Sequence, residues 1–229
     1  MWTKDTWPER VEEFLASDQS MKEKYSWPFP MGVFGTLRQA QGNNRRMHAG
    51  EVKDHRVGFL PHFYAQGLSI GYHRDSCAPF EVFSYEQDQW NRMIPGVDSL
   101  EGFTPSRVTE YSRDWGYFRT LVWIHLLPPD TVNEWFPEMG KSADLWHRRD
   151  MKIDPKTWDS YEKVPCWVYS NQSSNRNLIT ELYHPRGIVP PAINKSMYGQ
   201  NPLIWPAPLP EEKTEEESTG QFWRKPEYK

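Results

Sequence analysis

Short apolar runs separated by glycine, proline and polar turns fill the middle of the chain, from Met31 to about Ile124. Runs of this length that contain β-branched and aromatic residues are typical of strands. They fall at residues 33–34, 57–60, 68–70, 80–83 and 121–124, with a further run at 165–169. The pattern predicts a sheet of short strands to which the last run returns after an interruption.

Apolar residues near the N-terminus have the spacing of a helix. Thr6 and Glu9 have the separation of a capping box, in which each side chain bonds the backbone N–H of the other residue. Apolar residues follow at Val11, Phe14 and Leu15, one helical turn apart. A short helix that docks on the main body is therefore predicted.

A second helix interrupts the strands at residues 87–94. Trp90, Met93 and Ile94 share one stripe at helical spacing. Pro95-Gly96 follows directly, and proline inside a helical pattern usually ends the helix at the residue before it. We expect the helix to stop there.

Differences in composition and in hydrophobic pattern divide the chain into four segments. A helical extension covers residues 1–27, and a barrel domain covers 28–171 with an irregular, polar insertion at about 128–164. A proline-rich arm follows at 172–210, and an acidic tail, which we expect to be solvated and disordered, covers 211–229. Within the insertion, short helices are predicted around 130–137 and 142–150.

Composition narrows the class of protein. The 229 residues carry a net charge of −4, which gives no general reason to expect a nucleic-acid or anionic-membrane partner. Mean hydropathy is low at −0.83, yet 15% of the residues are aromatic, so an aromatic core wrapped in polar loops is expected.

Two further features bear on location and chemistry. No run approaches the roughly 18 apolar residues of a membrane span, and the N-terminus lacks the apolar core of a secretory signal, so a cytoplasmic location is expected. The two cysteines, Cys77 and Cys166, are too few for a disulfide scaffold and are expected to be free and buried. No pair of histidines has the spacing of a zinc site, so no metal is expected.

Two local patterns are candidates for a site. At Gly35-Thr36-Leu37 a strand runs into a glycine-containing turn, where exposed backbone N–H groups can bind a carboxylate or phosphate. At Glu101 a carboxylate is flanked by apolar Leu100 and Phe103, and apolar surroundings raise the pKa of a carboxyl group into the range of a general base. Taken singly, an ordinary turn and a solvated surface glutamate remain the simpler interpretations.

Taken together and in order, these segments resemble the γ-glutamylcyclotransferase-like family, which includes γ-glutamylamine cyclotransferases and AIG2-like proteins. Members carry a Y-G-T-L or Y-G-S-L turn often continued by K-x-G-x-x-N, then a G-x-V-Y strand, a helix, an L-D-x-x-E-G segment and a Y-x-R strand. The matching segments here are Phe34-Gly35-Thr36-Leu37-Arg38 with Asn43, Glu81-Val82-Phe83, Val97-Asp98-Ser99-Leu100-Glu101-Gly102 and Tyr117-Phe118-Arg119. The resemblance covers about residues 31–126, with 167–169 as the last strand.

The resemblance implies an α+β fold, a small mixed β-barrel with a helix on its side and a pocket at one barrel mouth. Glu101 would be the catalytic acid/base, and the amides of Gly35-Thr36-Leu37 would hold a substrate α-carboxylate. The matches at Phe34, Asn43 and Tyr117 would also contact the substrate. The implied reaction is attack of the α-amino nitrogen of a γ-glutamyl compound on its own γ-carbonyl, which releases an amine and 5-oxoproline without a cofactor.

Three features depart from the family pattern. Phe34 replaces the usual tyrosine and removes its hydroxyl, and Arg38-Gln39-Ala40 stands where K-x-G is usual. Residues 103–116 make a longer connection than usual before Tyr117, and this loop is expected to cover or reshape the pocket. The departures bear more on which amine the substrate carries than on the fold.

A rival hypothesis keeps the barrel but makes the chain a binding or interaction protein. The arm at 185–210 and the insertion at 128–164 would then be docking surfaces for a partner protein or for a second copy of the chain. Their tryptophans would be the anchors, because tryptophan is enriched in binding hot spots; they are Trp135, Trp146, Trp158 and Trp205. The alternative for each tryptophan is packing onto its own barrel.

Overall fold

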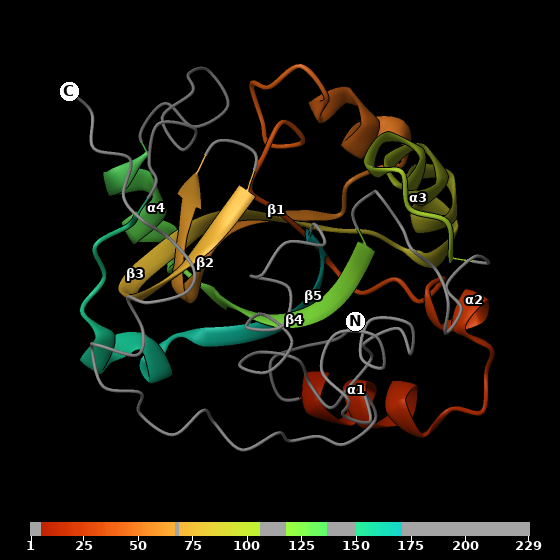
Figure 1. Ribbon diagram of the computed structural model, residues 1–229, viewed down its shortest axis with the longest axis horizontal. Coiled ribbons are helices and arrows are strands. Elements are labelled where there is room, and N and C mark those ends of the chain that lie inside the picture. Colours follow the sequence, from red (N-terminus) through yellow and green to blue (C-terminus); the bar gives the residue numbers. More distant parts are fainter. Residues whose placement is uncertain (1–5, 67–68, 106–117, 137–149, 171–229) are drawn as a thin grey trace, which may run out of the picture.

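The chain folds around a closed β-barrel (Figure 1). The computed structural model describes residues 6–66, 69–105, 118–136 and 150–170. Its strands follow the order β1-β3-β2-β4-β5 around the barrel, and only the β1–β5 pair that closes it is parallel. Their bounds are β1 Met31–Val33, β2 Asp54–Gln66, β3 Ser69–Ser84, β4 Phe118–Leu126 and β5 Glu162–Ser170. The predicted α+β class with a small mixed barrel is confirmed.

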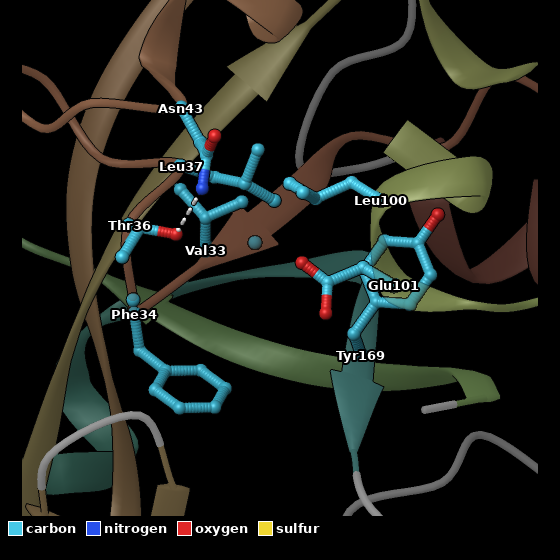
Figure 2. A pocket seen from close by; sticks show the side chains of 10 residues that line it. Val33, Phe34, Thr36, Leu37, Asn43, Leu100, Glu101 and Tyr169 are labelled. Carbon is cyan, nitrogen blue, oxygen red and sulfur yellow. Dashed lines mark hydrogen bonds between the residues drawn. The ribbon is translucent and has the colours of Figure 1, made fainter. Parts of the chain in front are cut away.

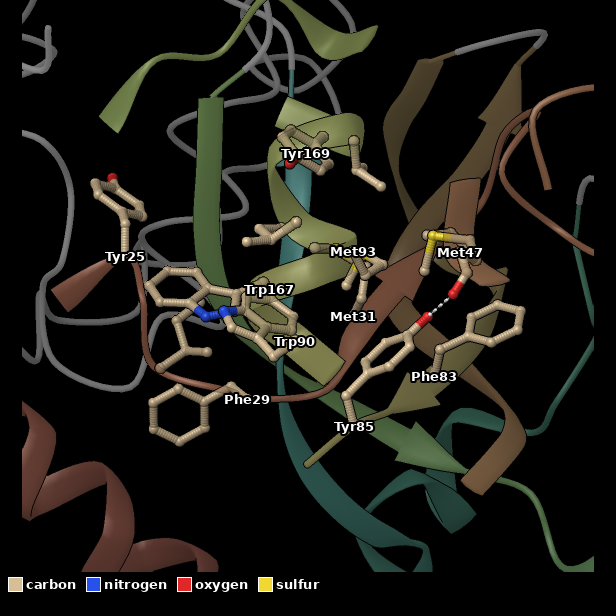
Figure 3. Packing of buried hydrophobic residues seen from close by; sticks show 14 of the residues in the cluster. Tyr25, Phe29, Met31, Met47, Phe83, Tyr85, Trp90, Met93, Trp167 and Tyr169 are labelled. Carbon is tan, nitrogen blue, oxygen red and sulfur yellow. Dashed lines mark hydrogen bonds between the residues drawn. The ribbon is translucent and has the colours of Figure 1, made fainter. Parts of the chain in front are cut away.

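Alternation along the strands separates two apolar cores. On β5, Val164, Cys166 and Val168 pack with residues such as Phe80 in one cluster, whereas Trp167 and Tyr169 belong to another. Successive side chains of a strand point to opposite faces, so the first cluster fills the barrel and the second lies between the barrel and the helices. Figure 3 shows this second, aromatic cluster, which includes Trp90 and Trp167.

β2 and β3 form a hairpin much longer than the apolar runs indicated. The predicted strand at 80–83 and the described part of the one at 68–70 belong to one strand, β3, although its pairing with β2 breaks off after Tyr72 and resumes at Cys77. The register shifts between Pro61 and Phe63, where His62 has a φ of 61°. This irregularity bends the hairpin, as β-bulges do.

Helix α1, Trp7–Ala16, confirms the predicted N-terminal helix. The predicted capping box does not form: Thr6 occupies the N-cap position, but its backbone is already helical and its side chain makes no capping hydrogen bond. Val11 and Phe14 are buried, and the Phe14 ring lies 5.8 Å from the ring of Trp167 on β5. The helix therefore docks on the barrel through its apolar stripe.

Helix α3, Gln87–Glu101, corrects the prediction that a helix stops before Pro95. The buried stripe of Trp90, Met93 and Ile94 continues at helical spacing to Val97. A proline inside a helix costs one backbone hydrogen bond, about 3 kcal/mol or more. The burial of residues beyond Pro95 offsets that cost and carries the helix on to Glu101.

The insertion packs onto the barrel where the structure describes it. Helix α4, Pro129–Trp135, confirms the first predicted helix, and most of the second, at 142–150, lies outside the described residues. Trp158, in the 3-10 helix η3 (Pro155–Ser160), is buried in a core cluster, and Trp135 packs against that cluster. These two tryptophans therefore pack onto their own barrel. The predicted boundary at 164 was too late, because β5 begins at Glu162.

The remaining described helices are α2, Met21–Lys24, and the 3-10 helix η1, Asn44–Ala49. No helix within the described ranges is both long and apolar enough to cross a membrane. The predicted arm at 172–210, the tail at 211–229 and nearly all of the loop at 103–116 lie outside the described residues, as do Trp146 and Trp205.

Candidate functional site

The end of α3 places Glu101. The helix terminates at Gly102, which adopts the left-handed conformation with a φ of 69°. The N–H groups of Gly102 and Phe103 both bond the carbonyl of Asp98, so the last turn closes in a Schellman-type arrangement. Phe103 is buried beyond this cap. The last helical side chain, Glu101, is thereby fixed beside the ends of β1 and β5.

A pocket of about 260 Å³, partly open to solvent, lies at this junction (Figure 2). Its walls come from β1 and the turn that follows, from the last two residues of α3 and from β5. The lining residues are 32–37, Asn43, Leu100, Glu101 and Tyr169. The volume is near the lower end of the roughly 300–1,000 Å³ of small-molecule sites, which suits a ligand of amino-acid size.

The Glu101 carboxylate points from α3 toward the turn that bears Phe34 and Thr36 (Figure 2). Burial raises the pKa of Glu101 to about 7. Within the described parts of the chain, no hydrogen bond or ion pair reaches this carboxylate. Glu101 can therefore exchange a proton near neutral pH, as the apolar flanking residues predicted.

The turn opposite Glu101 is held by side chains that follow it. Asn43 donates from its side chain to the Thr36 hydroxyl at 2.9 Å and from its backbone N–H to the Thr36 carbonyl at 3.2 Å. Asn44 donates to the Leu37 carbonyl at 2.8 Å. Among the described residues, no partner occupies the backbone N–H groups of residues 35–37. Residues 35–37 line the pocket, so their N–H groups are candidate donors to a bound anion.

Phe34 forms the apolar side of the pocket. It is buried, and its ring meets that of Phe80 edge-on at a centroid distance of 5.3 Å within the barrel core. Phe34 therefore belongs both to the barrel core and to the pocket wall.

A buried ionic network lies behind the pocket. Arg119 on β4 is 1% exposed, and its Nε lies 3.0 Å from Asp98 Oδ1 on α3. The hydroxyl of Tyr169, whose side chain lines the pocket, donates to the same carboxylate. Burial raises the pKa of Asp98, and the charge of Arg119 and the bond from Tyr169 counteract that rise. Because Asp98 is three residues before Glu101, this network fixes the last turn of α3.

Aromatic rings surround the Arg119 guanidinium on several sides. Its central carbon lies between 5.1 and 5.6 Å from the ring centroids, which is within the range of a cation–π interaction. The rings belong to Tyr25, Trp90, Phe103 and Trp167. The charge of Arg119 is thus compensated by Asp98 and these rings.

Most residues that the sequence predicted for the site line this one pocket. Phe34, Gly35, Thr36, Leu37 and Asn43 stand on one side, and Glu101 stands on the other. Tyr117 lies outside the described residues.

Sequence reasoning missed Tyr169, which it treated only as part of a strand. The alternation along β5 could have placed Tyr169 on the same face as Trp167, and the parallel β1–β5 pairing then brings it beside the turn.

No protein-family model matches the chain, and no curated protein matches it. Over the described part of the chain, no group of three or more His, Cys, Asp or Glu side chains is arranged to hold a metal ion.

Proposed function

We propose that this chain is a γ-glutamylcyclotransferase-like enzyme that releases an amine and 5-oxoproline from a γ-glutamyl compound. The observation that carries the proposal is the Glu101 carboxylate, with its pKa raised to about 7, across one pocket from the available amides of residues 35–37. The ordered motifs that resemble the family support the same assignment. A candidate base and candidate donors for a carboxylate that line one pocket of suitable size support the proposal.

Glu101 would move the proton that the reaction has to transfer. The α-ammonium of a γ-glutamyl group cannot attack until it loses a proton, which the ionised carboxylate of Glu101 accepts. The freed nitrogen then forms a bond to the γ-carbon, and the C–N bond to the departing amine breaks as Glu101 returns the proton to that amine. The attacking nitrogen gives up its second proton as it becomes the lactam N–H, and this proton also passes to the amine, which leaves as an ammonium ion. One carboxyl group therefore serves both steps, and the enzyme ends in its starting protonation state.

The turn would hold the substrate in the folded shape that ring closure needs. The N–H groups of residues 35–37 can bind the α-carboxylate, which leaves the α-nitrogen free to reach the γ-carbonyl. Such pre-orientation contributes a large part of the acceleration of intramolecular reactions. The apolar wall formed by Val33, Phe34 and Leu100 limits water around Glu101.

The first test is turnover of defined substrates. The purified chain is incubated with a panel of γ-glutamyl dipeptides and γ-glutamyl amines, including γ-glutamyl-ε-lysine, and 5-oxoproline is quantified by mass spectrometry. We expect at least one member to yield 5-oxoproline and free amine in equal amounts, above the rate in heat-denatured protein. No product from any member would refute the enzyme proposal.

The pH dependence is a second prediction. In the free enzyme Glu101 must be ionised to accept a proton, and its pKa is about 7. We therefore expect kcat/KM to fall about tenfold for each pH unit below 7 and to level off above it. The measurement is kcat/KM for the best panel substrate between about pH 5.5 and 8.5 in buffers of constant ionic strength. A profile that stays flat from about pH 8.5 down to about 5.5, as a glutamate with the ordinary pKa of 4.5 would give, would contradict the role of Glu101.

The rival interaction hypothesis gains no support from the described residues. Trp135 and Trp158 pack onto their own barrel, and the arm at 185–210 lies outside the described residues. We therefore propose it only as the alternative that inactivity across the panel would favour.

A further inference from the structure

A second carboxylate is buried beneath the loop that continues the pocket turn. Glu81 lies on β3, directly opposite Val33 of β1, and is 2% exposed. Its neighbours Phe80 and Val82 belong to the core inside the barrel. Glu81 therefore points away from that core, on the side where the chain leaves β1.

The contacts of this carboxylate join it to the loop. Glu81 Oε2 accepts a hydrogen bond from the backbone N–H of Gln39 at 2.8 Å. The same oxygen lies 3.2 Å from Nε2 of His55 on β2. Arg38 is also buried, and the negative charge of Glu81 counteracts the fall that burial causes in the pKa of Arg38. The carboxylate thus connects strand β3 to residues directly after the pocket turn.

The turn at residues 38–41 contains a strained backbone position, and a hydrogen bond to Glu81 can stabilise it. Gln41 donates from its backbone to the Arg38 carbonyl at 3.2 Å, and Ala40 has a φ of 60° while Gln39 has a negative φ. These features define a type II turn, whose third position favours glycine. Alanine is strained in this left-handed conformation. A hydrogen bond to a buried carboxylate is strong enough to offset that strain.

We propose that Glu81 is a positioning residue that anchors the loop at Gln39 and so holds residues 35–37 with their N–H groups available for a substrate α-carboxylate. This inference rests on the proposed function for the identity of the ligand. Glu81 does not line the pocket and touches no reacting group. Its effect should therefore fall on substrate binding, equally in the ground and transition states.

Variants on both sides of the Glu81–Gln39 bond test the proposal. Glu81→Leu removes the acceptor, and Gln39→Pro removes the donated N–H while suiting the second position of a type II turn. For both we expect KM to rise about tenfold or more, the cost of losing a hydrogen bond to a charged group, with kcat within about threefold. Glu81→Gln is the graded comparison, because its amide oxygen can still accept the bond but carries no charge, and its KM should lie between those of the native chain and Glu81→Leu.

Hydrogen exchange at the Gln39 amide supplies a readout independent of activity. We expect this amide to be protected in the native chain and in Glu81→Gln, and to exchange faster in Glu81→Leu. If Glu81→Leu does not fold, the KM of Gln39→Pro decides. An unchanged KM in Gln39→Pro, or equal protection of Gln39 in a folded Glu81→Leu, overturns the inference. Faster exchange in a chain that turns over no γ-glutamyl compound supports the anchor and refutes only the proposed function.

Discussion

A Glu101→Gln variant is expected to form 5-oxoproline roughly 10²–10⁴-fold more slowly than the native chain, the usual contribution of a general acid/base. The amide has nearly the size of the carboxylate but cannot accept the proton of an α-ammonium. KM should change little, because in the proposed function the turn at residues 35–37, and not Glu101, holds the substrate. The measurement is kcat and KM at pH 8 for the best substrate, where the native carboxylate with a pKa of about 7 is ionised.

Stability measurements separate this loss from misfolding. Burial raises the pKa of Glu101 from the ordinary 4.5 to about 7, so the folded state holds this proton more tightly than the unfolded state does. The contribution of Glu101 to stability therefore decreases as pH rises from 4.5 through 7. A neutral glutamine lacks this penalty, and the variant should melt at the same or a higher temperature than the native chain at pH 8. A variant that retains native turnover would refute the catalytic role of Glu101.

An Asp98→Ala substitution is expected to lower the free energy of unfolding by about 3–5 kcal/mol, because it leaves Arg119 charged, buried and without its carboxylate. The Arg119 and Asp98 side chains are 1% and 10% exposed, so solvent cannot replace the lost partner. Tyr169 also loses the acceptor of its hydroxyl. The measurement is urea denaturation followed by tryptophan fluorescence.

An exposed ion pair of similar length serves as the control. Lys163 Nζ lies 2.8 Å from Asp159 Oδ1, and the Asp159 side chain is 94% exposed. Asp159→Ala should cost about 0.5 kcal/mol or less, because such pairs are screened by water. A double variant, Asp98→Leu with Arg119→Met, should recover much of the loss because no unpaired charge remains. If Asp98→Ala costs no more than Asp159→Ala, the network does not stabilise the fold as described.

The local sequence pattern predicted which strands and helices form better than it predicted where they begin and end. The apolar runs located the strands because burial on one face sets the alternation. They could not show that β3 is continuous from Ser69 to Ser84, since residues 73–76 are all polar and carry no apolar pattern. Pro95 indicated an end to the helix that α3 does not have. The sequence pattern shows the hydrogen bond that a proline removes, but it does not show the burial of Val97 and Asp98 beyond it.

Only part of the candidate site could be predicted, because local patterns do not show which strands become neighbours. Glu101 and the turn at residues 35–37 carry recognisable local patterns, and their meeting in one pocket follows from the resemblance. Tyr169 and Glu81 have no such pattern: their positions depend on which strands become neighbours when the barrel closes. The parallel pairing of β1 with β5 is a property of the whole topology, which a single sequence segment does not encode.

The hydrogen bonds of Asn43 and Asn44 to residues 36 and 37 close the connection after β1 into a loop of backbone. Glu101 belongs to a different element, α3, so changes in this loop need not displace its carboxylate. Within the loop Gln39 is bonded to Glu81, whereas a side chain added at Gly42 would meet open space. Substitutions at Gly42, next to the pocket residue Asn43, are accordingly a route to altered ligand selectivity that leaves both carboxylates in place.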